Sequence, residues 1–188
     1  MFLNPVPRLE TERLLLRPLD VRDVWAYYDL FRDPEALHHW SSLPMQSPAE
    51  AWADLHRVME CCSRLVTMEW AVVMRETKRM IGTICLHSPS VQCRRAEVGY
   101  MIARPHWNKG FATESLTAVV AFAFSKLNLN RLDADIHPGN IASEKLLLRL
   151  GFQKEGYIRE RWIVGDAVSD SILFGLLARE WAARQTLE

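Results

Sequence analysis

The segment EVGYMIARPHWNKGFATES, residues 97–115, joins a strand pattern to a helix pattern through a loop that carries Lys109 and Gly110. Apolar residues recur at helical spacing directly after the loop, so a helix begins within it. The first turn of a helix presents unpaired N–H groups and the positive end of the helix dipole, and a glycine lets a ligand approach the backbone closely. Glycine and asparagine are also frequent in ordinary turns. These residues alone therefore predict either a simple helix start or a binding site for an anion.

Strand patterns lie on both sides of this segment. Residues 70–74 and 80–86 are β-branched runs separated by a polar turn, which predicts a hairpin, and residues 96–102 extend it into a meander. Gly99 is expected at a bulge or at a point of close approach. After the helix, residues 131–136 form another strand, which should run parallel to residues 96–102 through a right-handed crossover.

The N-terminal part of the chain is predicted to hold one strand and two helices. Residues 14–19 are typical of a short strand. The helix after it should bury one face, whose residues recur at helical spacing: Val21, Val24, Tyr28 and Phe31. A second helix is expected after Ser47, with Pro48 at its first position and Glu50 placed to complete a capping box.

The C-terminal part is predicted to hold a helix followed by a hairpin. The helix covers residues 140–150 and ends at Gly151, since glycine readily adopts the left-handed conformation that ends helices. Residues 154–164 and 168–177 read as two strands joined by a turn at residues 165–166.

The composition is that of one globular domain with balanced charge. The chain has 188 residues, with 23 Lys and Arg against 23 Asp and Glu, so a nucleic-acid binder with a large basic surface is disfavoured. No signal peptide or membrane-spanning run is recognisable. The four cysteines lack the spacing of a zinc site, and reduced thiols are typical of the cytosol. We therefore expect a single domain over residues 1–188 in the cytoplasm, with no metal, no nucleic acid and no membrane partner.

Common nucleotide, metal and hydrolase motifs are absent from the sequence. The loop lacks GxxxxGK[ST], because Lys109 precedes its only glycine, and no GxGxxG follows a strand. There is also no HExxH and no GxSxG. A P-loop nucleotidase, a dinucleotide-binding fold and the commoner metal and serine hydrolases are thus disfavoured.

Three segments together carry a family resemblance. The opening segment, followed by NRLDADIHPGNIASEKLLLRLGF at residues 130–152, resembles the acetyl-CoA-binding core of the GNAT superfamily of N-acetyltransferases. LETERLLLRPL, residues 9–19, resembles the start of the branch that contains the ribosomal-protein N-terminal acetyltransferases. The resemblance covers residues 8–177 with the motifs in the same order.

The resemblance implies an α/β (α+β) fold with a mixed, mostly antiparallel sheet and flanking helices. Its parallel fourth and fifth strands, residues 96–102 and 131–136, would splay apart at Gly99 and admit the pantetheine arm of acetyl-CoA. The loop amides would hold the pyrophosphate, as the helix terminus itself suggests. The implied cofactor-binding residues are Met101, Ile102, Asn108, Lys109, Gly110, Phe111, Ala112, Thr113, Asn140 and Ser143. Trp107 departs from the pattern, because most members have Gln or Arg there.

The same resemblance implies direct attack of an amine on the thioester. This chemistry needs a neutral amine, a stabilised oxyanion and a proton for the leaving thiolate. Glu97 matches the position of a general base, although a solvated carboxylate at a strand end is the plainer interpretation. The tyrosine that many members use as the acid is replaced by Leu147. Ser143 is the substitute that the ribosomal branch suggests, with cofactor contact or helix capping as its alternative role, and the backbone N–H of Met101 or Ile102 would stabilise the oxyanion.

Other residues are weaker candidates for the acceptor side. Glu160 is expected two residues before Trp162 on the same strand face, and His137 has a pKa range suited to base chemistry. The acceptor site is expected between HHWSSLP at residues 38–44, the second helix and the hairpin at residue 165. Three tryptophans would line that site or pack in the core: Trp40, Trp52 and Trp162.

The expected function is acetyl transfer from acetyl-CoA to a primary amine. The acceptor would be a protein N-terminal α-amine or a small-molecule amine, and the α-amine is easier to deprotonate because its pKa lies near 8 rather than near 10. The protein would act as a monomer or a homodimer. The alternative is a non-catalytic acyl-CoA-binding protein that keeps the pyrophosphate-binding loop but does not transfer the acyl group.

Overall fold

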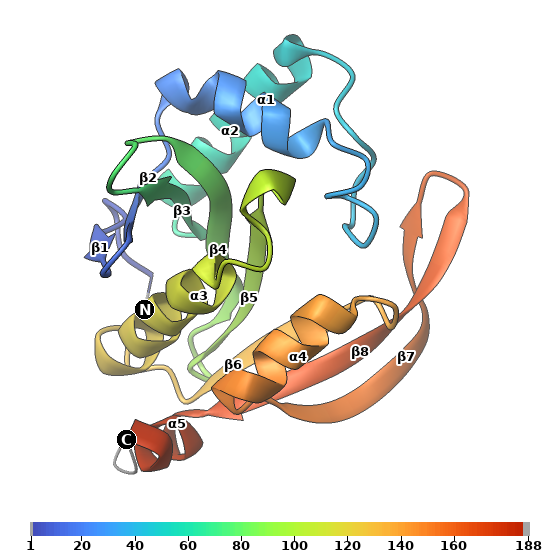
Figure 1. The fold of residues 1–188 in the computed structure, drawn as a ribbon. Helices are drawn as coiled ribbons and strands as arrows, with labels where there is room; N and C mark the ends of the chain where they lie inside the picture. The colour runs from blue at the N-terminus through green and yellow to red at the C-terminus, as the bar shows by residue number, and fades with distance from the viewer. Residues whose placement is uncertain (1, 186–188) are drawn as a thin grey trace.

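A computed structural model describes residues 2–185 and shows a mixed sheet with helices on both faces (Figure 1). The strands are β1 (Leu9–Glu10), β2 (Leu14–Pro18), β3 (Met68–Met74), β4 (Met80–Ser90), β5 (Arg95–Ile102), β6 (Arg131–Ile136), β7 (Gln153–Val164) and β8 (Ala167–Leu177). The helices are α1 (Val24–Phe31), α2 (Pro48–Ser63), α3 (Phe111–Ser125), α4 (Ile141–Leu150) and α5 (Ala178–Gln185), with short 3-10 turns at Val21–Asp23 and Arg104–His106. Within the described residues the eight strands follow the order β1-β2-β3-β4-β5-β6-β8-β7.

The sheet divides between β5 and β6, as predicted. These two strands are parallel, but they pair only at Arg95↔Arg131, Ala96↔Leu132 and Glu97↔Asp133. They are the strands expected as fourth and fifth, since the two-residue β1 precedes them in the numbering. Gly99 forms no bulge: it pairs in register with Cys85 of β4, and a Cβ added to it would lie 3.1 Å from the Cys85 sulfur. The close approach is therefore the correct alternative for Gly99.

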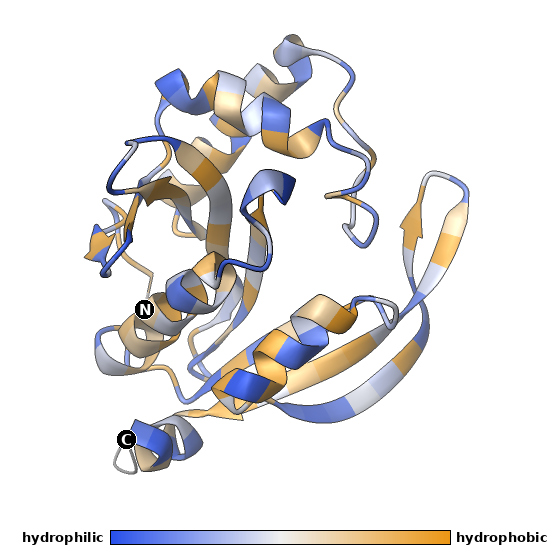
Figure 2. Ribbon diagram, in the orientation of Figure 1, coloured by the Kyte–Doolittle hydropathy of each residue, from blue (hydrophilic) through white to orange (hydrophobic). Residues whose placement is uncertain are grey.

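Two hydrophobic layers cover opposite faces of the sheet, because successive side chains of a strand point to opposite sides. One layer joins Val98 and Ile102 of β5 to α3 and α4, and Figure 2 shows α3 largely in the hydrophobic colours. The other layer joins Met101 of the same strand to α1 and α2. The opening between β5 and β6 thus has α3 and α4 on one face of the sheet and α1 and α2 on the other.

The first helix buries Phe31 as predicted, with Val24 and Tyr28 partly buried against the same core, but the predicted Val21 is not buried. Tyr27, Leu30 and Phe31 are its buried residues, whereas Val21 is 37% exposed. The 3-10 turn before α1 changes the helical phase, and it is fixed by Asp23, which receives two hydrogen bonds from the Arg17 guanidinium. Regular helical spacing therefore cannot be counted from Val21.

The predicted start of α2 and both predicted ends of α4 are confirmed, whereas the predicted capping box of α2 is not formed. Ser47 accepts a hydrogen bond from the Glu50 N–H at 3.3 Å, while the Glu50 carboxylate reaches the Gln46 N–H instead of completing the capping box on Ser47. The Asn140 side chain caps α4, and Gly151 ends it in the left-handed conformation, with φ at 93°. No helix in residues 2–185 is both long and apolar enough to span a bilayer.

The C-terminal hairpin of β7 and β8 is confirmed, but the two strands do not pair regularly along their whole length. The pairing shifts between Ile158 and Trp162, where Glu160 has a positive φ of 52°. This irregularity breaks the simple alternation that placed Glu160 and Trp162 on one face. The tip of the hairpin projects past the N-terminal start of α4, and α5 follows at the other end of β8 (Figure 1).

Candidate active site

A cleft of about 690 Å³ opens where β5 and β6 diverge. Its floor comes from residues 98–102 of β5 and 134–136 of β6. Its walls come from the loop before α3, the first turns of α4 and part of the segment between α1 and α2. A second hollow, of about 730 Å³, lies among residues 5–8 and 17–23, away from this division of the sheet. The first cleft is the candidate site, because it alone joins the split sheet to the helix N-terminus of the predicted loop.

The start of α3 fits a bound diphosphate. Gly110 stands at the N-cap with φ at 80°, a conformation that glycine adopts without strain, and it has no side chain to accept from the N–H groups of the first turn. Ala112 and Thr113 line the cleft with little bulk. Open N–H groups at the positive end of a helix suit a phosphate group. The loop therefore has the backbone geometry that the anion-binding interpretation requires.

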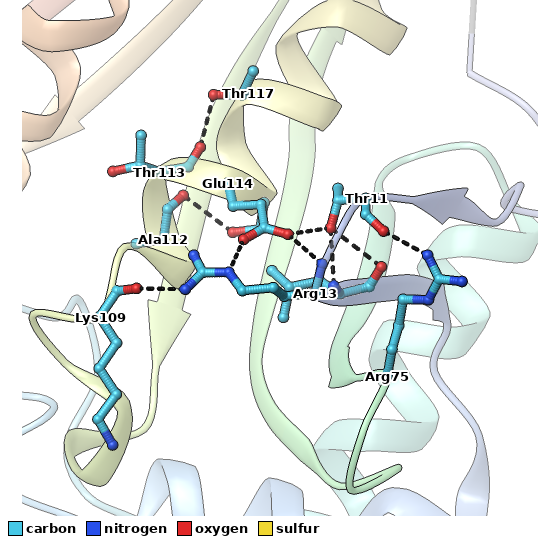
Figure 3. Close-up of polar contacts among 10 residues, drawn as sticks. Thr11, Arg13, Arg75, Lys109, Ala112, Thr113, Glu114 and Thr117 are labelled. Atoms are coloured by element: carbon cyan, nitrogen blue, oxygen red, sulfur yellow. Dashed lines mark hydrogen bonds and ion pairs between the residues drawn. The ribbon is translucent and has the colours of Figure 1, made fainter.

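Arg13, just before β2, fastens this loop from outside the cleft (Figure 3). Its guanidinium donates to the Lys109 carbonyl at 3.0 Å and to the Glu114 carboxylate at 2.7 Å, and it lies 4.5 Å from the centre of the Phe111 ring. The Thr11 hydroxyl donates to the same carboxylate. A residue about a hundred positions earlier thus fixes the direction of the Lys109 carbonyl and the start of α3.

Lys109 itself is not a lining residue of the cleft. Its ammonium donates to the Pro105 carbonyl at 2.8 Å, and in Figure 3 the side chain points away from the network around Glu114. Every other predicted cofactor-binding residue lines the cleft.

Trp107 has a structural role that the sequence did not reveal. Its indole N–H donates to the Ile102 carbonyl at 2.5 Å, which ties the loop to the end of β5. The side chain also lines the cleft. The tryptophan therefore links the two parts of the opening segment, the strand and the helix start.

The beginning of α4 brings Asn140 and Ser143 to the cleft. The Asn140 side-chain oxygen Oδ1 accepts from the Ser143 N–H at 3.1 Å, so the asparagine side chain caps the helix. Ser143 lines the cleft opposite Tyr100 of β5, and its hydroxyl lowers the pKa of that tyrosine while burial, the larger effect, raises it to about 12. The Tyr100 hydroxyl oxygen is buried and has no hydrogen-bond partner among the described residues.

Glu97 lies where β5 and β6 begin to separate, because it forms the last of the three residue pairs that join these strands. Its pKa is raised, first by burial and then by the nearby carboxylates of Asp135 and Asp133, against the opposing charges of Arg161 and Arg95. Its carboxylate lies 3.8 Å from the His87 imidazole. Glu97 does not line the cleft, but Asp135 does. A carboxyl with this environment is poised to accept a proton nearer to neutral pH than an ordinary glutamate.

Asp135 is held firmly beside the cleft. Its side chain is 4% exposed, accepts a hydrogen bond from the Ser171 hydroxyl and pairs with Arg161 at 3.3 Å. These contacts hold the Asp135 carboxylate in a fixed position beside the cleft.

The other residues predicted for the acceptor site do not all lie at the cleft. Trp40 lines the cleft, whereas Trp52 and Trp162 are exposed and lie outside its lining. His137 stacks on His39 with ring centres 4.8 Å apart, at the end of β6. Across residues 2–185, no group of three or more histidines, cysteines or acidic residues is arranged to hold a metal ion.

Comparison with known proteins identifies the family. The family model of the acetyltransferase (GNAT) domain matches residues 13–153. The chain belongs to the GNAT acetyltransferase family. The uncharacterized N-acetyltransferase YoaA of Bacillus subtilis (strain 168) is 38% identical over 91% of this chain and 97% of its own length. The [ribosomal protein uS5]-alanine N-acetyltransferase of Escherichia coli (strain K12) is 28% identical, with 94% of each chain covered.

The fold agrees with this assignment. The crystal structure of a GNAT-family acetyltransferase from Bacillus anthracis superposes with a TM-score of 0.82, covering 93% of this chain and all of that one at 21% identity. The protein is thus an acetyltransferase, and the family uses acetyl-CoA as its acetyl donor.

Three residues of this GNAT acetyltransferase were missed by the sequence analysis. Tyr100 and Asp135 line the cleft and Arg13 lies beside it, and each interacts with residues distant in sequence. All three residues lie in the quoted motifs, but their contacts depend on how the strands are placed. No local spacing could have identified them.

Proposed function

We propose that the protein transfers the acetyl group of acetyl-CoA to a primary amine by direct attack of the amine on the thioester. One observation carries the proposal: the gap between β5 and β6 and the uncapped N-terminus of α3 open into the same cleft. The gap suits an extended chain with its own amides, and the helix start suits a diphosphate. Acetyl-CoA contains both groups.

Glu97 is the proposed general base. Its raised pKa lets it take a proton from an ammonium or from a bridging water, and the carboxylates around it favour a cationic acceptor. The backbone N–H of Met101 or Ile102 is the proposed oxyanion donor, whereas the Ile102 carbonyl is already bonded to Trp107. Ser143, at the cleft, remains a candidate in the delivery of a proton to the thiolate.

The proposed acceptor is an α-amine at the N-terminus of a peptide. The relative from Escherichia coli is named for acetylation of an alanine of ribosomal protein uS5, which supports this class. An α-amine, with a pKa near 8, is also easier for a single carboxylate base to deprotonate than a lysine side chain is. Small-molecule amines are the second class to test.

The deciding experiment measures thiol release from acetyl-CoA in the presence of single amines. The panel contains peptides with different first residues, amino acids, polyamines and aminoglycosides. We expect release above background hydrolysis for peptides with a small first residue such as alanine. Acetyl-CoA should raise the melting temperature whether or not the protein is an enzyme. Stabilisation without release for any amine would favour the alternative, a non-catalytic acyl-CoA-binding protein.

A further inference from the structure

The hydroxyl of Tyr100 is a buried polar group without a partner inside the candidate site. Its oxygen has no hydrogen-bond partner among residues 2–185, yet the side chain lines the cleft beside Ser143. Leaving a buried hydroxyl unbonded costs free energy, so such groups are rare in folded proteins. A partner supplied by a substrate would remove this cost.

Strand geometry places this hydroxyl on the opposite side of the sheet from Glu97. Val98 and Ile102 pack against α3 and α4, and Tyr100 packs on the same layer. Met101 packs on the layer of α1 and α2, so Glu97, four residues earlier, points to that side. The proposed base and the free hydroxyl therefore lie on opposite faces of β5.

The other positions for an acid on α4 are unsuited to proton donation. Leu147, where many family members carry a tyrosine, is fully buried in the core and bears no proton. Ser143 is the only hydroxyl-bearing residue of α4. Tyr100, opposite it, thus offers a phenol to the same space from the strand instead of from the helix.

We propose that Tyr100 donates the proton taken up by the departing thiolate of coenzyme A, and that the nearby Ser143 hydroxyl relays the replacement proton during turnover. This inference rests on the acetyl transfer proposed above. The amine nitrogen forms the new bond to the acetyl carbon, the carbon–sulfur bond breaks, and the phenolic proton moves to the sulfur. The amine loses its proton toward Glu97, and the tyrosinate recovers a proton through Ser143 from solvent.

The environment of Tyr100 is consistent with this role. Burial holds the pKa of its hydroxyl at about 12, so the phenol stays protonated at neutral pH and is available as a donor. The Ser143 hydroxyl acts in the opposite direction and stabilises the tyrosinate that forms during transfer.

The test replaces Tyr100 with phenylalanine, which removes only the oxygen. With an amine that the parent acetylates, kcat should fall by about tenfold or more, since a positioned acid contributes on the order of a hundredfold. The melting temperature should stay the same or rise, because the hydroxyl has no partner to lose. Tyr28→Phe is the matched control: that hydroxyl lies on α1 and bonds to the Gln46 carbonyl, and kcat should not change.

A second measurement does not depend on turnover. The thiol of bound coenzyme A is titrated by the ultraviolet absorbance of its thiolate, in the parent and in Tyr100→Phe. A hydrogen bond from Tyr100 should give the bound thiol a lower pKa in the parent than in the variant. Equal thiol pKa values, or a kcat for Tyr100→Phe equal to that of the parent, would overturn the proposal. A fall in melting temperature would do so too, because the hydroxyl would then be a structural bond.

Ser143→Ala separates the two hydroxyls. If Ser143 acts through Tyr100, the double variant should be no slower than Tyr100→Phe alone. Losses that multiply would show that Ser143 acts independently and would overturn its assigned role. If the parent acetylates no amine, the acetyl-transfer proposal fails, while the thiol titration still tests the contact between Tyr100 and the sulfur.

Discussion

Glu97 is the residue whose protonation should set the pH dependence of the reaction. Burial and the carboxylates of Asp135 and Asp133 raise its pKa. The acid limb of kcat/KM should therefore lie at a higher pH than the value of about 4.3 for an ordinary glutamate. Activity should fall as the pH drops through this raised pKa, because the base becomes protonated.

Glu97→Gln should lower kcat/KM by about a hundredfold near pH 7 and remove that limb, since the amide keeps the shape and loses the base. The measurement is a pH–rate profile of thiol release. Glu60→Gln, on the outer surface of α2, is the matched control and should reproduce the parent profile. If the Glu97→Gln profile coincides with that of the parent, the base is another group.

Arg13 connects two elements, because it holds the loop before α3 against the chain before β2. Arg13→Gln should raise the KM for acetyl-CoA by about five- to tenfold with little change in kcat, since the lost bonds position the loop in the ground state and the transition state alike. Stability should change by less than about 1 kcal/mol, because the arginine is 45% exposed in its ion pair with Glu114.

The control for this prediction lies in the same network. Arg75 donates to the Thr11 carbonyl at 2.8 Å but makes no contact with the loop (Figure 3). Arg75→Gln should leave the dissociation constant of acetyl-CoA unchanged by isothermal titration. Equal affinities for the two variants would show that the network supports only the N-terminal turn.

The elements also show which features a sequence can predict. Ser47, Asn140 and Gly151 were found because a helix end depends on residues within one turn of it. The exposed Val21 and the irregular strand at Glu160 were missed, because a 3-10 turn and a bulge each shift the phase of a regular pattern.

The residues of the candidate site also fall into two groups, those found from local sequence and those placed by tertiary packing. The loop residues 110–113 were identified from a contiguous motif, and they do line the cleft. Arg13, Tyr100 and Asp135 owe their positions to pairing between distant strands and helices. Their contributions follow from tertiary packing, which no local pattern records.

At the scale of the whole molecule, the stability should depend on pH through Glu69 of β3. Burial, the first cause, and the charge of Asp54 on α2 raise its pKa from 4.5 to about 7. A carboxyl whose pKa is higher in the folded state binds more protons there than in the unfolded chain. The free energy of unfolding should therefore fall as pH rises between about 4.5 and about 7.

Glu69→Gln should remove this dependence. At pH 8 the variant should be more stable than the parent by on the order of 1–2 kcal/mol, and at pH 5 the difference should shrink. Urea unfolding at the two pH values measures it, with Glu60→Gln as the surface control. A parent whose stability is flat over this range would contradict a raised pKa of Glu69.

The three-pair junction between β5 and β6 also has a consequence for how the chain is assembled. All strands on one side of the junction come from residues 9–102, and all strands on the other side come from residues 131–177. Each part is therefore one continuous stretch of chain. Apart from the junction, its strands pair only with strands of the same stretch. In the sheet the two halves are joined only by this short parallel ladder, whose paired residues lie 36 positions apart and are bridged by α3. The opening that receives the substrates is thus also the seam between two consecutive halves of the polypeptide.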